Sequence, residues 1–183
     1  DSFFHRTEGI LLMDRTKTKR ITIASIQPPC LDEASEAACA SMVEAGFSLL
    51  TEALGKGTTF CCLPEFFNVF GAPAESYNAL AANHSDILER VCTLAARHRS
   101  YIILPMLVPE AGAFYNRAYL IDAGGEIQGH YDKVHPTLGE QEQFKVKAGT
   151  VPAVFDTPYG RVALSICYDI YFPEFFSTLT RLK

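Results

Sequence analysis

The sequence predicts an α/β domain in which helices cover a mixed β-sheet. Short segments rich in β-branched and aromatic residues alternate with two longer segments whose apolar residues recur every three or four positions. Further along the chain, glycine-containing turns join pairs of apolar segments directly, which indicates hairpins and antiparallel neighbours. The chain has 183 residues, 48% of them hydrophobic. We therefore expect one domain with a sizeable core.

The chain is predicted to begin with a strand and then a helix. Residues 20–27 alternate β-branched side chains with small or polar ones and end at two prolines, which is typical of a strand. A helix is expected over 32–54, with Asp32 or Ser35 as its N-cap. One face of this helix would consist of Ala38, Met42, Ala45, Leu49 and Ala53. Glycines just beyond residue 54 would end it.

The next three elements continue the alternation. A strand is predicted over 58–63 and an amphipathic helix from about 77 to 98. The apolar stripe of that helix would consist of Leu80, His84, Ile87, Val91, Leu94 and His98. The apolar run 101–108 follows as a buried strand.

Two hairpins are predicted after that strand. The segments 115–122 and 126–132 flank Ala123-Gly124-Gly125, where glycine tolerates the positive φ of a tight turn. The segments 151–156 and 161–166 would form the second hairpin.

The remaining segments are a loop and a final helix. Residues 134–150 are predicted to form a long polar loop, and Pro173 fits the first turn of a helix. An alternating architecture would continue with a further strand. We therefore expect the chain to belong to a longer protein, with 1–19 as an N-terminal extension and 20–183 as a domain lacking its C-terminal portion.

Composition narrows the partners. The net charge of -5 gives no basic footprint for nucleic acid, and no apolar run approaches the length of a membrane span. The six cysteines have no regular spacing and no secretory context, which favours free thiols in a cytoplasmic protein. Because the sequence has no Cys-x-x-Cys pair, we expect no structural zinc site.

Three polar side chains stand at the ends of apolar segments. Glu65 ends the predicted strand near 58–63, Lys133 ends the first hairpin, and Cys167 ends the second. Strand ends that meet at one edge of a sheet would bring a carboxylate, an ammonium and a thiol into a single site.

These three groups have the chemistry of acyl transfer through a thioester. A thiol is a weak nucleophile until it loses its proton, and Glu65 is the candidate base. Lys133 would favour the thiolate and then the oxyanion of a tetrahedral intermediate. The backbone N–H of Tyr168, directly after the cysteine, is the candidate second oxyanion donor.

Other interpretations of the same residues stay open at this point. Taken singly, each has a structural explanation: a buried thiol, a loop cap and a surface ammonium. Cys167 could pair with His130 or His135 in a Cys-His dyad, as in thiol proteases. Asp169 could cap the helix that follows it or bind substrate.

The segments LPEFF (63–67), YDKVH (131–135) and SICYDIYFPE (165–174) resemble the three signature blocks of the carbon-nitrogen hydrolase, or nitrilase, superfamily. They occur in the family's order, and the resemblance extends from Arg20 to Lys183. It implies an α-β-β-α sandwich, formed when two such domains pair and here cut short after the nucleophile. It also implies that Glu65, Lys133 and Cys167 are the catalytic triad, with no metal or organic cofactor.

The resemblance also implies a supporting glutamate in the loop after the lysine. The segment EQFKVKAG (142–149) aligns best with that block, so Glu142 is the candidate, with Glu140 as the alternative two residues away. The residue would hold Lys133 and the substrate amide in line. Tyr168, through its backbone N–H, is the other supporting residue.

The Tyr168-Asp169 pair resembles the amidase and carbamoylase branches, whereas true nitrilases usually have Trp-Glu there. A small linear amide or N-carbamoyl compound is the implied substrate. Tyr171 stands where many of those enzymes have arginine, so that residue's substrate contact is not carried over. A homo-oligomer is implied as well. The alternatives are a non-catalytic binding or assembly subunit and a thioester acyltransferase.

Overall fold

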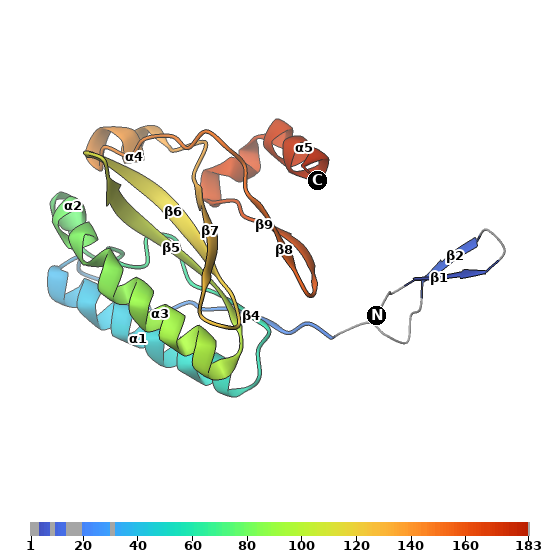
Figure 1. Cartoon of the computed structure of the whole chain (residues 1–183). Helices are drawn as coiled ribbons and strands as arrows, with labels where there is room; N and C mark the ends of the chain where they lie inside the picture. The colour runs from blue at the N-terminus through green and yellow to red at the C-terminus, as the bar shows by residue number, and fades with distance from the viewer. Residues whose placement is uncertain (1–3, 8–9, 14–19, 30–31, 183) are drawn as a thin grey trace.

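The computed structural model describes residues 4–7, 10–13, 20–29 and 32–182. Its centre is a five-stranded sheet of order β3-β4-β5-β6-β7 (Figure 1). The strands are Ile23–Ser25 (β3), Phe60–Cys62 (β4), Tyr101–Glu110 (β5), Ala113–Ile121 (β6) and Ile127–Asp132 (β7). β3, β4 and β5 are parallel, and β6 runs antiparallel to both of its neighbours. The predicted mixed α/β sheet is confirmed.

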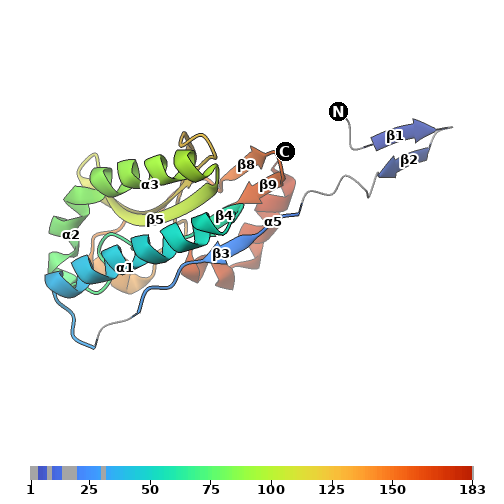
Figure 2. The ribbon, with the colours of Figure 1, turned by 90° about the horizontal axis from the view of Figure 1, so that it is seen from below.

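Helices cover one face of the sheet and smaller elements cover part of the other. Glu36–Gly55 (α1) and His84–His98 (α3) lie side by side on the first face (Figures 1 and 2). Val154–Thr157 (β8) and Gly160–Ala163 (β9) form an antiparallel hairpin on the second, next to Pro173–Arg181 (α5). The second predicted hairpin therefore exists, although its strands are shorter than expected.

The other described elements are short. They are the strands Phe4–Thr7 (β1) and Ile10–Met13 (β2), the α-helices Tyr77–Leu80 (α2) and Leu138–Gln143 (α4), and the 3-10 helices Ala74–Ser76 (η2), Ala81–Asn83 (η3) and Cys167–Tyr171 (η4). β1 and β2 pair as a separate two-stranded sheet. The expected boundary between residues 1–19 and 20–183 stays a prediction.

Side chains of the sheet alternate between two cores, because successive strand residues point to opposite faces. On β5, Ile102, Leu104 and Met106 pack with the residues of α1 and α3. Tyr101 on the same strand packs instead with Leu164 and the segment around α5. The sheet is therefore apolar on both faces, and it positions whatever follows its strand ends.

The helix α1 begins where the sequence indicated but buries a different face. Ser35 is its N-cap, accepting a hydrogen bond from the Ala38 N–H at 3.0 Å. The predicted stripe was wrong beyond Met42, since Leu49 is exposed. The buried positions are Ala38, Cys39, Met42, Gly46, Phe47, Leu50 and Leu54. A Cβ atom on Gly46 would lie 2.4 Å from the Phe67 ring, so a residue without a side chain occupies the closest packing position.

Although no uninterrupted apolar run is long enough, α1 has the length and apolar composition of a membrane-crossing helix. Its buried residues Phe47, Leu50 and Leu54 belong to the core between the sheet and the helices. Packing against the sheet accounts for this composition.

The predicted helix over 77–98 is interrupted. The chain forms α2, then the 3-10 turn η3, and only then α3. Ala81, at the interruption, is fully buried in a small cluster with Leu107 and Val146. Tertiary packing of this alanine redirects a chain whose apolar spacing alone would continue one helix.

The cysteines and the final helix also bear on the sequence predictions. Cys39, Cys61, Cys62, Cys92 and Cys167 are free thiols, whereas Cys30 lies outside the described residues. Pro173 begins α5 as expected. Phe175 is buried in the core, while Phe176 is partly exposed. The homo-oligomer and the cytoplasmic location stay predictions.

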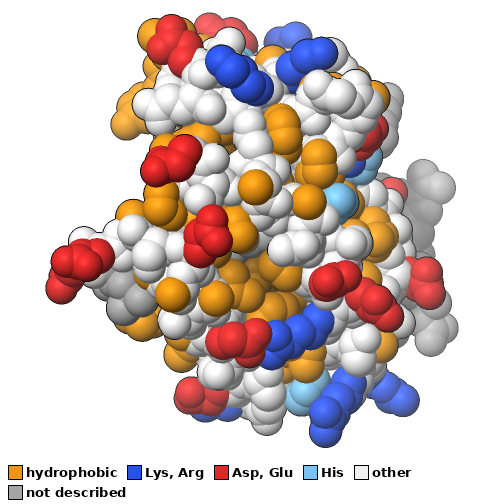
Figure 3. Space-filling view, turned by 90° about the vertical axis from the view of Figure 1, so that its left-hand side faces the viewer, with side chains coloured by type: hydrophobic (Ala, Val, Ile, Leu, Met, Phe, Trp, Pro, Cys, Tyr) orange, Lys and Arg blue, Asp and Glu red, His pale blue; other side chains and the backbone are white. Residues whose placement is uncertain are grey.

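The face shown in Figure 3 has hydrophobic side chains gathered in a hollow near its centre, with acidic and basic side chains around them. Charges of both signs are therefore interspersed on this face.

Candidate active site

The strand directions explain how two of the predicted site residues meet. Because β6 reverses the chain between β5 and β7, the strands β4, β5 and β7 all end at the same edge of the sheet. Glu65 follows β4, and Lys133 directly follows β7. Their side chains are in contact, with the Lys133 Nζ donating to the Glu65 Oε1 at 2.9 Å.

Lys133 is one of the most buried charged groups in the described chain, with 1% of its side chain exposed. Its Nζ also lies 2.9 Å from the Glu140 Oε2 and 3.1 Å from the Oε1. Burial alone would lower the pKa of Lys133, but hydrogen bonds to Glu140 and Glu65 outweigh it and the pKa is raised. The amine therefore stays charged between two carboxylates.

Glu140, and not Glu142, is the second carboxylate at the lysine. The loop predicted over 134–150 contains the short helix α4, which begins with a capping box. The Thr137 Oγ1 accepts from the Glu140 N–H at 3.2 Å, and the Glu140 Oε2 accepts from the Thr137 N–H at 2.7 Å. This turns the Glu140 side chain inward, whereas Glu142 is exposed. The preference for Glu142 is corrected.

The capping box was the available signal for this residue, because Thr137 precedes Glu140 by three positions in the printed sequence. Burial would raise the pKa of Glu140, but the Thr137 N–H, Lys133 and Asn116 donate to the carboxylate, and the pKa is lowered. Glu140 is therefore ionised at neutral pH and balances the charge of Lys133.

Asn116 is a site residue that sequence reasoning missed. It lies on β6 and is fully buried. Its Nδ2 donates to the Glu65 Oε1 and to the Glu140 Oε1, each at 2.7 Å. A polar amide in the middle of an apolar strand was the signal, since an unpaired buried amide is costly.

Cys167 is the first residue of η4 and reaches the same site from the other side. The extended residues Leu164 and Ile166 before it are buried. Cys167 itself is exposed and has φ +44°, a conformation that costs a non-glycine residue about 1–2 kcal/mol. It lines a cavity of about 180 Å³ together with Glu65 and Cys62. The structure thus brings the three predicted catalytic residues to one place.

The electrostatic surroundings keep the Cys167 thiol protonated. Burial and the Glu65 carboxylate raise its pKa, and the Lys133 ammonium acts in the opposite direction without cancelling them. The pKa of Cys167 is therefore above that of an ordinary thiol. Near neutral pH the sulfur needs a base at the moment of attack.

Asp169 connects the cysteine segment to the lysine segment. Its Oδ2 accepts from the Ile166 N–H at 2.9 Å and from the Tyr131 hydroxyl at 2.7 Å. Its Oδ1 accepts from the His135 N–H at 3.1 Å and lies 2.8 Å from the His135 Nδ1. With no exposed surface, Asp169 is a structural cap and not a substrate ligand.

The histidines do not form a dyad with Cys167 in this arrangement. The Nδ1 of His135 is occupied by Asp169, and its ring stacks on Phe172 with centroids 3.7 Å apart. His130 lies 3.7 Å from Asp132. The charged groups that act on the Cys167 thiol are Glu65, Lys133 and Glu140.

A search of the described residues finds no group of three or more His, Cys, Asp or Glu side chains arranged to hold a metal ion.

A glycine fixes the chain against the end of the lysine strand. The Gly149 N–H donates to the Lys133 carbonyl at 2.9 Å. A Cβ atom on Gly149 would lie 2.1 Å from the Asp132 carbonyl oxygen and 2.8 Å from its carbon. Backbone atoms cannot rotate away as a flexible side chain can, so this close approach requires glycine.

Replacing Gly149 by alanine is therefore expected to destabilise the fold by about 1–3 kcal/mol, the usual cost of forcing extra atoms into packed structure. Urea unfolding measures this. Gly55→Ala is the matched control, because no atom lies within 4 Å of its added Cβ and alanine favours a helix. Equal unfolding midpoints for the two variants would contradict the role of Gly149.

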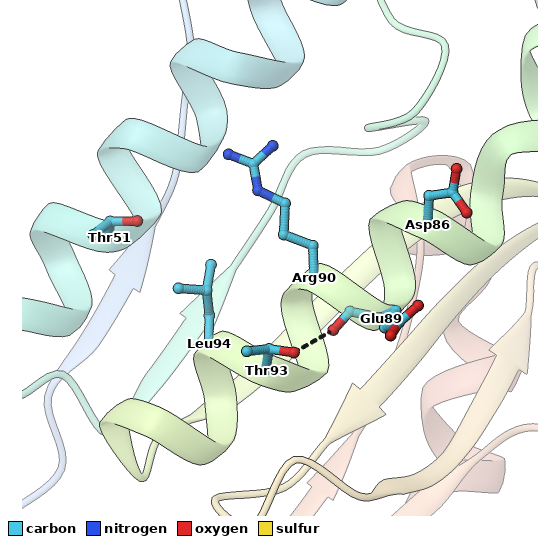
Figure 4. Close-up of a pocket in the computed structure, with 6 residues that line it drawn as sticks. All are labelled: Thr51, Asp86, Glu89, Arg90, Thr93 and Leu94. Carbon is cyan, nitrogen blue, oxygen red and sulfur yellow. Dashed lines mark hydrogen bonds between the residues drawn. The ribbon is translucent and has the colours of Figure 1, made fainter.

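A separate groove of about 390 Å³ lies on the helix layer between α1 and α3 (Figure 4). Arg90 extends from α3 toward α1, where it donates to the two Glu44 oxygens at 2.5 and 3.0 Å. Its guanidinium also lies 3.6 Å from the Phe47 ring centroid. These contacts join the two helices, so we interpret the groove as structural.

The fold and the site place this chain among layered α/β proteins that carry a cysteine, a lysine and a glutamate at one edge of a sheet. The family model for carbon-nitrogen hydrolases matches residues 22–182. The chain belongs to the carbon-nitrogen hydrolase family, as its motifs predicted.

Curated relatives of this chain include amidases. The chain is 29% identical to a deaminated glutathione amidase of Dictyostelium discoideum, over 91% of this chain and 61% of that protein. It is 30% identical to an N-carbamoylputrescine amidase of Arabidopsis thaliana, over 86% of this chain and 54% of that protein. The chain thus spans little more than half the length of these relatives.

Solved structures share the fold. The carbon-nitrogen hydrolase from Helicobacter pylori G27 superimposes with a TM-score of 0.72 at 21% identity, covering 86% of this chain and 55% of that one. An amidase from Nesterenkonia sp. gives the same TM-score and identity, covering 87% and 60%. The expected nitrilase-type α/β fold is confirmed.

Proposed function

We propose that the protein containing this chain hydrolyses a non-peptide C–N bond in a small linear amide or N-carbamoyl compound through a thioester on Cys167. The observation that supports this most directly is the buried Lys133, which contacts Glu65 while Glu65 acts on the Cys167 thiol. The amidases and the carbamoyl amidase among the relatives support the substrate class.

In the first step, Glu65 takes the proton of Cys167 as the sulfur attacks the carbonyl carbon. A base is needed because the pKa of this thiol is raised. The C–S bond forms and the carbonyl π electrons move to oxygen. Lys133 engages its carboxylates on two sides, which leaves one of its three N–H bonds for the oxyanion. The Tyr168 N–H, in the first turn of η4, is the proposed second donor.

In the second step, the tetrahedral intermediate collapses and the C–N bond breaks. Glu65 returns its proton to the leaving nitrogen, which departs as ammonia or an amine and leaves a thioester. Water then attacks the thioester carbon while Glu65 accepts a proton from it. The C–S bond breaks, the acid or carbamate product leaves, and the thiol of Cys167 regains its proton.

Glu140 keeps Lys133 fixed and charged through this cycle. Glu65 changes its protonation state twice in each turnover, so it cannot be the constant partner of the ammonium. Glu140, whose pKa is lowered, stays ionised and provides that constant charge.

Two measurements test the proposal together. Fluoroacetamide is a suitable probe, since its acetamide moiety is added covalently at the active site cysteine in an amidase from Nesterenkonia sp. AN1. Peptide mass analysis should find Cys167 modified at least tenfold faster than Cys61 or Cys62, which are shielded. Ammonia release from a panel of amides and N-carbamoyl compounds should be lost in both Cys167→Ser and Cys167→Ala.

Cys92→Ser is the control, because Cys92 packs against the helix-side core, away from the Cys167 cavity. It should keep the wild-type rates. Ammonia release that survives both Cys167 variants would refute the thioester mechanism. Equally slow modification of Cys167 and the shielded cysteines would favour a non-catalytic subunit.

A further inference from the structure

The amide of Asn116 is held in one orientation by two carboxylates. Both of its donor contacts, to the Glu65 Oε1 and to the Glu140 Oε1, are 2.7 Å long. An amide turned by 180° would place its own oxygen against those two oxygens and repel them. The NH₂ group therefore has to face the carboxylates, since Asn116 is fully buried.

This orientation leaves the other end of the amide unpaired. Within the described part of the chain, no donor reaches the buried Asn116 Oδ1. A buried unpaired acceptor costs about 1–3 kcal/mol, and an apolar residue of the same size would avoid that cost. A residue chosen only for packing or stability would not be an amide here. The two donors are the property that distinguishes asparagine at this position.

The contact with Glu65 also distinguishes its two oxygens. The Oε1 accepts from both the Lys133 Nζ and Asn116, at 2.9 and 2.7 Å. An oxygen with two strong donors holds the negative charge and is a poor proton acceptor. Oε2 is then the oxygen available to receive a proton from the thiol.

We propose that Asn116 is a positioning residue that ties Glu65 to Glu140 and directs the Oε2 of Glu65 to act as the base toward Cys167. The inference rests on the proposed role of Glu65. It adds an amide to the glutamate, lysine and cysteine and assigns the two oxygens of Glu65 different tasks. Asn116 touches neither the sulfur nor the reacting carbonyl, so it acts only through the carboxylates.

The pH dependence of Cys167 reactivity provides a readout that a merely structural residue would not change. Four titratable groups surround the sulfur: Glu65 beyond β4, Lys133 beyond β7, Glu140 on α4, and Cys62, which lines the same cavity. Without the Asn116 donors, the two carboxylates present more negative charge to the sulfur, and the thiolate becomes less favourable.

The test uses fluoroacetamide modification of Cys167 in the 183-residue chain, followed by peptide mass from pH 6 to pH 10. In Asn116→Leu, which keeps the volume, the pH of half-maximal rate should move upward by about 0.5–1 unit, while the urea midpoint is retained or increased. Asn116→Asp should move it further, because it adds a third carboxylate. Asn116→Ala serves if the leucine variant does not fold, and the same upward shift is expected.

Asn68→Leu is the matched control. Asn68 is also a buried asparagine, but both ends of its amide are satisfied by the Leu107 backbone, each at 2.9 Å. It should lower the urea midpoint and leave the half-maximal pH unchanged. An unmoved half-maximal pH in the folded Asn116 variants would overturn the positioning role.

The two proposals fail in different ways. If wild-type Cys167 reacts no faster than the shielded cysteines, the proposed function fails and the positioning role fails with it. If wild-type Cys167 reacts rapidly and only the Asn116 variants behave as wild type, the positioning role fails alone.

Discussion

Replacing Lys133 by methionine is expected to have the largest effect of any single substitution, because it removes the cation that two buried carboxylates share. Methionine keeps the length and apolar stem of the side chain but leaves Glu65 and Glu140 facing each other. Breaking a buried pair by removing one partner typically costs 3–5 kcal/mol. Urea or thermal unfolding measures this loss.

The same substitution should nearly abolish the chemistry of the site. It removes an oxyanion donor, which is worth roughly 10²–10³ in kcat. It also removes the group that lowers the pKa of Cys167, so that pKa rises further. Ammonia release and the fluoroacetamide rate should both fall by at least 10²-fold, with the rate recovering only at higher pH.

Two further variants separate stability from chemistry. Adding Glu140→Gln to Lys133→Met removes one uncompensated charge and should recover part of the stability without recovering reactivity. Lys56→Met is the surface control, since the Lys56 side chain is 71% exposed and pairs only with Glu52 on the same helix. A Lys133→Met variant with wild-type unfolding and wild-type modification would contradict the site as described.

The second large effect is expected from Glu140→Gln and not from Glu142→Gln. Glutamine has the shape of glutamate but not its charge, and one of its two terminal atoms is a donor that opposes the Lys133 ammonium. Charge-assisted hydrogen bonds contribute about 1.5–3 kcal/mol each. Loss of one such contact at Lys133 should lower kcat/KM and the Cys167 modification rate by about 10²-fold.

Glu142→Gln is the matched control because both residues lie in the same short helix, two positions apart. Its side chain is exposed, so rates within twofold of wild type are expected. The reverse result, with Glu142→Gln impaired and Glu140→Gln normal, would restore the assignment made from the sequence block and refute the one made from the structure.

The fold was predictable because its pattern is local. Strand runs and glycine turns depend on residues close together in the chain, and β3 to β7 appear in the predicted order. The failures occurred where distant residues decide. Gly46 is buried because Phe67 packs onto it, and the helix expected over 77–98 is interrupted where Ala81 enters a cluster with Leu107.

The site was predictable for the same reason and to the same extent. Glu65, Lys133 and Cys167 stand in segments whose spelling is specific, and strand direction alone implied that their ends would meet. Glu142 was chosen by aligning a block, whereas the capping box at Thr137 determines which carboxylate turns inward. Asn116 belongs to no polar motif, and its importance depends on β6 lying beside β7.

The sequence by itself determined the kind of element each segment forms, the family, and the three side chains that stand at segment ends, because periodicity and short motifs are properties of neighbouring residues. Only the tertiary structure decided which groups surround Lys133 and how the two oxygens of Glu65 differ. Hydrogen bonds of 2.7 to 2.9 Å between Asn116, Glu65, Lys133 and Glu140 join residues up to 75 positions apart (65 to 140). Such contacts exist only once the strands that bear them are paired.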